Sequence, residues 1–216
     1  MVCLVLALAV VSGAQAKAPP DGFRVCGPAA CIPLSQDAAE QLALDLFFGG
    51  AAAMNAAPPP TSYYMLRWRW QQVAQDSTAY YVPDAGAAYM LQSTGGPVAT
   101  RRGWLALHNV AQTALAQTTS SLTPFPAALP VRVTVGRKVV RDPTGYASLW
   151  WIGDRTSIID SPDARWLRIR IATATASPWA GSIWIGRHKP LLMRDDAVFR
   201  ISRTLAVRVR NARPLG

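Results

Sequence analysis

Apolar residues along this chain switch repeatedly between alternating and helical spacing. Residues 23–34 alternate on either side of Gly27-Pro28, a turn signal, and predict a β-hairpin. After Ser35, apolar residues recur at intervals of three and four up to residue 47, which is the spacing of one helical face. Ser35 is suited to cap this helix, because its hydroxyl can accept an N–H of the first turn.

The same order of hairpin and helix recurs three more times. In the second unit, Trp104 and Leu107 are expected on the inner face of the helix. In the fourth, the sequence from Val207 to Arg210 also alternates like a strand, but its position after a hairpin favours a helix. The predicted hairpins and helices are residues 23–34 and 36–47, 87–100 and 102–117, 131–140 and 143–151, and 190–201 and 203–212.

Short internal matches indicate a duplicated module. They pair 66–70 with 167–171, 81–83 with 184–186, 90 with 193, and 105–107 with 205–207, at offsets of 101, 103, 103 and 100. Near-constant offsets favour duplication, with chance similarity as the alternative. The runs 66–70 and 167–171 each predict a strand with two arginines on one face and large apolar groups on the other.

Together these patterns predict an α+β protein of repeated β-hairpin–helix units, with antiparallel sheets and an internal duplication. Residues 49–62 are rich in Gly, Ala and Pro and are interpreted as a linker. The expected division is a signal peptide at 1–16, an N-terminal hairpin–helix unit at 17–48, the linker at 49–62, a first module at 63–130, a hairpin–helix connector at 131–163, and a second, basic module at 164–216.

The N-terminus has the pattern of a secretory signal peptide. Residues 2–11 are uninterrupted apolar residues, and Ala14-Gln15-Ala16 forms a small-x-small cleavage site before Lys17. The run is too short to span a bilayer core of about 30 Å. A buried N-terminal helix or strand is the alternative. No Lys or Arg precedes the run, so whether Met1 is the true start stays open.

Removal of this leader, which contains Cys3, leaves two cysteines. Cys26 and Cys31 flank a turn, and an even count in an exported chain predicts a disulfide between them. A bridge closing so small a ring contributes about 2 kcal/mol. A redox role is the less favoured alternative, because thioredoxin-type sites have two residues between the cysteines and this chain has four.

Positive charge is concentrated in the C-terminal part. The formal net charge is +10, and residues 131–216 hold sixteen basic and six acidic side chains, whereas residues 17–130 hold six of each. We expect the partner to be an anionic cell-envelope polymer or membrane surface, not nucleic acid, which an exported protein rarely meets. A protein that is simply alkaline is the alternative. The anion-binding candidates are Arg187, Lys189, Arg203, Arg208, Arg210 and Arg213.

The sequence carries no recognisable catalytic or metal motif. It lacks a G-x-S-x-G elbow, a phosphate loop and H-E-x-x-H, and neither His108 nor His188 has a ligand partner at helical spacing. We therefore expect a non-catalytic, secreted or envelope-associated protein without a cofactor or metal. The alternative is a secreted hydrolase acting on envelope glycan or peptide. A concave pocket holding a histidine beside a carboxylate would favour it. The oligomeric state stays open.

Aromatic residues are abundant and often neighbour arginine. Tryptophan and tyrosine beside arginine can stack on sugar rings, although such residues more often fill a core. The chain also resembles small exported proteins of unassigned function from high-GC actinobacteria. The residues that carry the resemblance are Val25-Cys26-Gly27 with Cys31, residues 184–187 and residues 191–195. The resemblance implies export and no particular activity.

Overall fold

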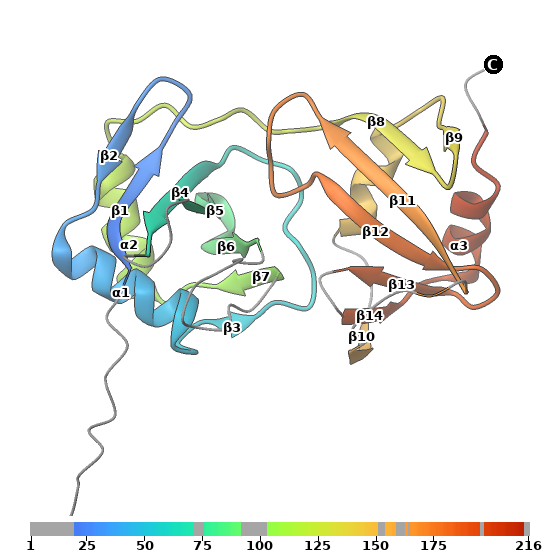
Figure 1. The fold of residues 1–216 in the computed structure, drawn as a ribbon, viewed down its shortest axis with the longest axis horizontal. Helices are drawn as coiled ribbons and strands as arrows, with labels where there is room; N and C mark the ends of the chain where they lie inside the picture. Colours follow the sequence, from blue (N-terminus) through green and yellow to red (C-terminus); the bar gives the residue numbers. More distant parts are fainter. Residues whose placement is uncertain are drawn as a thin grey trace, which may run out of the picture.

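The structure is a computed structural model, and it describes residues 20–70, 76–91, 103–150, 154–158, 163, 165–194 and 197–213. Two antiparallel sheets and three α-helices make up the described part, so the chain is an α+β protein. An N-terminal half, blue to green in Figure 1, lies beside a C-terminal half, yellow to red. The predicted signal peptide lies outside the described residues.

The N-terminal half forms one seven-stranded sheet with two helices. Its elements are β1 (Asp21–Cys26), β2 (Cys31–Pro33), α1 (Gln36–Phe47), β3 (Ala52–Ala53), β4 (Tyr64–Arg69), β5 (Ser77–Val82), the 3₁₀ helix η1 (Pro83–Ala85), β6 (Ala87–Met90), β7 (Gly103–Ala106) and α2 (Asn109–Thr119). The predicted first hairpin and helix are confirmed, and the Ser35 hydroxyl accepts a hydrogen bond from the backbone N–H of Ala38.

The C-terminal half forms a second seven-stranded sheet. Its elements are β8 (Pro130–Val135), β9 (Lys138–Val139), the 3₁₀ helix η2 (Thr144–Trp150), β10 (Asp154–Ile158), β11 (Trp166–Thr173), β12 (Gly181–Gly186), β13 (Leu191–Arg194), β14 (Ala197–Arg200) and α3 (Arg203–Arg210). The ambiguous last segment is a helix, and the Ser202 hydroxyl caps it by accepting from Leu205 N–H.

The two sheets have the same strand order. The first is β2-β1-β4-β5-β6-β7-β3, and the second, started from its other edge, is β9-β8-β11-β12-β13-β14-β10. Each strand thus corresponds to the strand seven places later, and a helix follows the last strand in both halves. The predicted match of residues 105–107 with 205–207 does not fit this correspondence, because the first run begins in β7 and the second lies in α3.

Each half has its own core, and a shared aromatic cluster joins the two. Helices α1 and α2 cover one face of the first sheet, over Leu66 and Trp68. The other face places Tyr63 and Trp104 against Trp179 of the second half, with ring centroids 5.8 Å apart in both pairs. Trp179 is fully buried, and its indole N–H donates to the Pro58 carbonyl over 2.8 Å. The halves therefore pack through apolar rings with a satisfied polar atom between them.

A buried arginine forms a second connection between the halves. The guanidinium of Arg194 donates to the carbonyls of Leu149, at 2.6 Å, and Asn55, at 3.2 Å, and lies 4.2 Å from the ring centroid of Phe199. Its side chain is 2% exposed. Because the two acceptors come from different halves, this side chain holds residue 55 against the second half.

The structure differs from the sequence pattern at residues 102–117. Residues 103–106 form strand β7, and α2 begins only at Asn109. Trp104 and Leu105 point to opposite faces of the sheet, and both are buried. A short strand that is buried on both faces and a buried helix can share the same continuous apolar run. Periodicity alone therefore could not distinguish a strand from a helix at residues 103–106.

The expected domain division also changes. Residues 49–62 are not an extended linker, because they contain β3 and pack Ala57 into the shared core, with its N–H bonded to the Trp150 carbonyl. The unit at 17–48 supplies β1 and β2 to the same sheet as 63–130, and residues 131–163 supply β8 to β10 to the second sheet. The chain therefore has two structural halves.

Candidate functional site

A basic cavity lies between α3 and η2 in the C-terminal half. Its volume is about 510 Å³, within the range of small-ligand sites. The N–H of Arg141 donates to the Arg213 carbonyl over 3.3 Å, which ties the chain after β9 to the end of α3. The residues lining this α3 cavity are Val140, Arg141, Asp142, Gly145, Tyr146, Leu149, Leu205, Val207, Arg208, Val209, Asn211, Ala212 and Arg213.

Charge in the α3 cavity is predominantly positive. Arg141, Arg208 and Arg213 line it with one carboxylate, Asp142. A single oxygen of that carboxylate accepts from both the N–H and the hydroxyl of Thr144, at 3.1 and 2.7 Å, as the cap of η2. None of the three arginines forms an ion pair with another described residue. The cavity is therefore suited to an anionic group.

Tyr146 adds a neutral hydroxyl to the cavity wall. Burial raises the pKa of its phenol, and the negative charge of Asp142 raises it further. The phenol thus stays protonated at neutral pH and can donate a hydrogen bond.

The helix pattern explains why α3 presents its arginines to this region. Ala206 and Val209 are buried against the second sheet, so Arg208 remains exposed on the other side. Arg208 and Arg210 lie in the last turn, where the partial negative charge of the helix end favours cations.

The structure separates the six predicted anion-binding residues into three groups. Arg208 and Arg213 meet in the α3 cavity, together with Arg141, which the sequence analysis did not select. Arg141 precedes η2, and no sequence signal placed η2 beside the last helix. Arg203 and Lys189 are exposed, and Arg187 lies in the turn after β12.

Arg210 has a structural role in this arrangement. Its guanidinium donates to the carbonyls of Gly186, at 3.0 Å, and Lys189, at 2.6 Å. These two bonds attach α3 to the turn between β12 and β13. The Arg210 side chain is therefore hydrogen-bonded to the backbone of the turn, and it does not line the α3 cavity.

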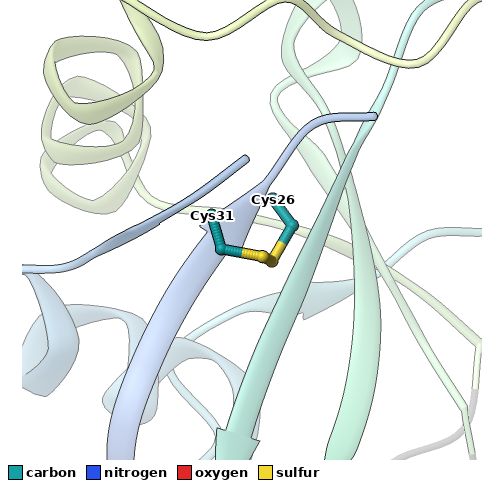
Figure 2. The surroundings of a disulfide bond; sticks show 2 residues. All are labelled: Cys26 and Cys31. Atoms are coloured by element: carbon teal, nitrogen blue, oxygen red, sulfur yellow. A yellow bond between two sulfur atoms is a disulfide. The ribbon is translucent and has the colours of Figure 1, made fainter. Parts of the chain in front are cut away.

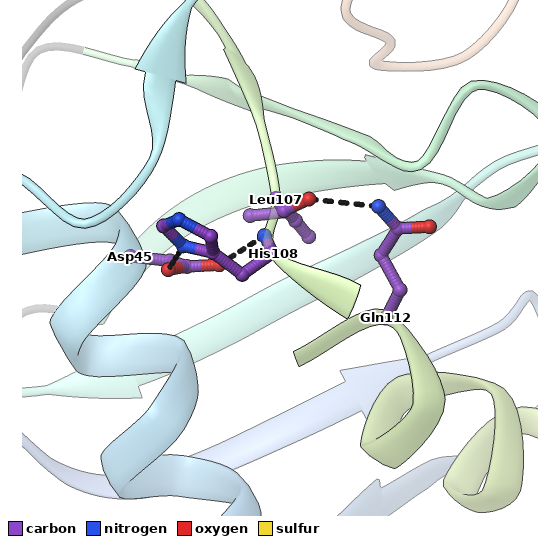
Figure 3. Close-up of polar contacts among 4 residues, drawn as sticks. All are labelled: Asp45, Leu107, His108 and Gln112. Carbon is purple, nitrogen blue, oxygen red and sulfur yellow. Dashed lines mark hydrogen bonds and ion pairs between the residues drawn. The ribbon is translucent and has the colours of Figure 1, made fainter. Parts of the chain in front are cut away.

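A histidine and a carboxylate meet at the junction of α1 and α2 (Figure 3). Asp45 is buried in α1 and accepts from both the backbone N–H of His108, at 2.7 Å, and its ring Nδ1, at 2.6 Å. His108 is the residue before α2, so the carboxylate supplies the cap that this helix start otherwise lacks. Sequence periodicity placed His108 inside a helix and therefore missed the pair.

The arrangement also has the geometry of a general base. The Asp45 carboxylate is bonded to Nδ1, so Nε2 is the ring nitrogen that would accept a proton from a substrate. The His108 side chain is 63% exposed. Gly50 packs on the other side of the carboxylate, where an added Cβ would lie 2.8 Å from Asp45 Oδ1. Neither Asp45 nor His108 lines the α3 cavity. His188, the second histidine, is exposed.

The predicted disulfide between Cys26 and Cys31 is present (Figure 2). The two residues are opposite each other at the end of the β1–β2 hairpin, with Cα atoms 3.9 Å apart. Gly27 is required at this turn, because an added Cβ would lie 2.1 Å from the Thr123 carbonyl oxygen. A disulfide of this kind indicates an oxidising, extracytoplasmic environment.

Comparison with known proteins gave no match to a family model, a curated protein or a solved structure. Within the described residues, no helix has the length and apolar character needed to cross a membrane. The described part also contains no group of three or more His, Cys, Asp or Glu side chains able to hold a metal ion. Functional inference therefore depends on the charge and geometry of the sites described above.

Proposed function

We propose that the protein is exported and binds an anionic polymer of the cell envelope through its basic C-terminal half, without a catalytic step. The observation that carries this proposal is the α3 cavity, where Arg141, Arg208 and Arg213 converge and the single carboxylate is bonded to Thr144. The predicted leader and the Cys26–Cys31 disulfide support export.

The physical basis is attraction between a concentrated positive surface and repeated negative charges. Arginine binds phosphate and carboxylate with two parallel N–H···O bonds, and such charge-assisted bonds are about twice as strong as neutral ones. Exposed charges are screened by salt, with a Debye length of about 10 Å at 0.1 M and about 3 Å at 1 M. Binding by this surface must therefore weaken steeply as salt is added.

The test is co-sedimentation of the exported protein with purified actinobacterial cell-wall material. The triple variant Arg141→Gln, Arg208→Gln and Arg213→Gln removes the three charges of the cavity. We expect at least tenfold weaker binding at 0.1 M salt, with the fold retained because all three side chains are exposed. Wild-type binding should be lost at 1 M salt.

The matched control removes three exposed arginines from the first half, Arg24, Arg67 and Arg69. It lowers the net charge by the same amount and should bind the wall nearly as well as the wild type. Equal loss in both triple variants would assign the binding to net charge alone. Wild-type binding that persists at 1 M salt would exclude the basic surface as its cause.

The His108–Asp45 pair is the observation that favours a second candidate function, hydrolysis of envelope glycan or peptide. In that case His108 would act as a general base, oriented by the carboxylate. The test is release of soluble fragments from cell-wall material by the wild type and by His108→Gln. Fragment release that depends on His108 would support a hydrolase and contradict the non-catalytic proposal.

We also infer that the two halves arose by duplication of one unit. The shared strand order supports this inference. The arginine-bearing strands β4 and β11 also occupy equivalent positions in the two sheets. In an experimental structure, the halves should superpose over β1 and β4–β7 with β8 and β11–β14. A superposition that places α2 and α3 on opposite faces of the sheet would contradict a common origin.

A further inference from the structure

The second sheet exposes β8, β11 and β12 on the face opposite its core, whereas Met193 of β13 and Val198 of β14 are buried on that same face. Side chains alternate along a strand, so the buried Ile169 and Ile171 of β11 point inward, and Arg168 and Arg170 point outward. We call the outward positions of β8, β11 and β12 the outer sheet face. Its side chains come from Arg132, Thr134, Trp166, Arg168, Arg170, Ala172, Ser182 and Trp184.

Cross-strand register fixes the arrangement on this face. Arg168 is opposite Trp184, and its guanidinium carbon lies 5.9 Å from the centroid of the tryptophan ring. The same guanidinium donates twice to the Ser182 hydroxyl, from Nε at 3.0 Å and Nη2 at 2.8 Å. Arg168 is therefore held beside an aromatic ring by neutral partners, and no carboxylate in the described part of the chain forms an ion pair with it.

Two further arginines extend the positive row. Arg170 is two residues along β11, about 7 Å from Arg168. Arg132 of β8 is opposite Ala172 of β11, and it therefore lies diagonally next to Arg170. All three arginines are exposed, and Trp166 and Trp184 are partly exposed beside Arg168. None of the outward positions of these three strands carries an acidic side chain.

In the first half, the equivalent strand also carries two arginines, and one of them lies beside carboxylates. Arg67 and Arg69 of β4 correspond in strand and alternation to Arg168 and Arg170 of β11. There, Arg69 forms an ion pair with Asp76 at 2.9 Å and is also opposite Asp21 in the sheet. The position next to them on β4 is Met65, where β11 has Trp166. The second half thus has more uncompensated charge and more exposed aromatic surface.

We propose that the outer sheet face binds an anionic polysaccharide, a proposal that rests on the polyanion binding proposed above and assigns it a ligand class. Tryptophan rings provide flat surfaces for sugar rings, and arginines provide paired donors for carboxylate or phosphate substituents. Two rings, Trp166 and Trp184, lie beside the arginine pair of β11, and this arrangement fits a chain in which apolar sugar faces and anionic groups recur.

The test measures binding of the full chain to three probes: polygalacturonate, inorganic polyphosphate and vesicles of anionic phospholipid. The variant Arg168→Gln/Arg170→Gln should bind polygalacturonate about tenfold more weakly than the wild type, because it can no longer form two charge-assisted hydrogen-bonded pairs. Arg168→Lys/Arg170→Lys, which keeps charge but loses the planar group, should fall in between. Trp184→Ala should weaken binding to polygalacturonate several-fold and leave polyphosphate binding unchanged.

The matched control is Arg67→Gln/Arg69→Gln on the equivalent strand of the first half, with an expected change below twofold. Equal loss in the two double variants overturns the site. Preference of the wild type for polyphosphate or vesicles over polygalacturonate overturns the ligand class. If none of the three probes nor cell-wall material binds the wild type, the proposed function itself fails. If cell-wall binding depends only on the α3 cavity, the proposed function stands and the outer sheet face is excluded.

Discussion

Replacement of Trp179 by alanine should destabilise the whole protein, because this side chain joins the two halves. The indole is fully buried between Tyr63 and Trp104 of the first half, although it belongs to the second. Its N–H also satisfies the buried carbonyl of Pro58. The substitution removes the ring packing and the hydrogen bond from one place.

The magnitude follows from the burial of the indole and its partners. Replacing a buried tryptophan by alanine costs about 3–5 kcal/mol, including the cavity left behind. Trp179 belongs at the upper end, because both ring pairs disappear and the Pro58 carbonyl is left without its donor. A loss of about 4–5 kcal/mol corresponds to a fall in melting temperature of roughly 8–20 °C for a chain of this size.

Urea unfolding followed by far-ultraviolet circular dichroism measures this loss without depending on tryptophan fluorescence. Trp179→Phe provides the internal comparison, because it keeps an aromatic ring and removes the hydrogen bond. It should cost about 1–2 kcal/mol. A loss below about 1 kcal/mol for Trp179→Ala would refute the idea that this ring holds the halves together.

Three other expected outcomes test separate parts of the structure. Arg194→Leu should lower the free energy of unfolding by about 3 kcal/mol, because the buried Leu149 carbonyl and the partly buried Asn55 carbonyl lose their donor; an unchanged urea midpoint would contradict this. Asp45→Ala should cost about 2 kcal/mol and expose the start of α2 to hydrogen exchange; unaltered exchange there would reject the cap. Burial raises the pKa of the Tyr63 phenol, so its contribution to stability should be constant below pH 10 and fall above it, because the unfolded phenol ionises first; a melting temperature that does not fall between pH 10 and pH 11 argues against it.

Local elements of this fold could be predicted where a turn or cap residue marked their ends. Ser35 identified the start of α1. The hairpin predicted at 131–140 is present as β8 and β9, with Gly136 at the turn between them at φ 61°. The faces of β4 and β11 were predicted from strict alternation of arginine and large apolar residues. These features depend on residues adjacent in the chain.

Features that depend on long-range packing could not be predicted. The α2 boundary is fixed by Asp45, sixty-three positions before His108, and no local signal reveals that partner. The α3 cavity likewise needs Arg141 beside the end of the last helix, which only the tertiary arrangement provides. The sequence therefore predicted a basic region, whereas the set of arginines that meet in the cavity became visible only in the folded chain.

Three of the four outermost strands of the two sheets are very short, and this restricts how the protein can be recognised at those edges. β3 and β9 have two residues each, and β2 has three. A row of unpaired backbone groups this short offers little template for an added peptide strand or for edge-to-edge polymerisation. Both sheets thus resist strand addition at these edges, and a partner approaching there must be recognised by side chains, not by main-chain pairing.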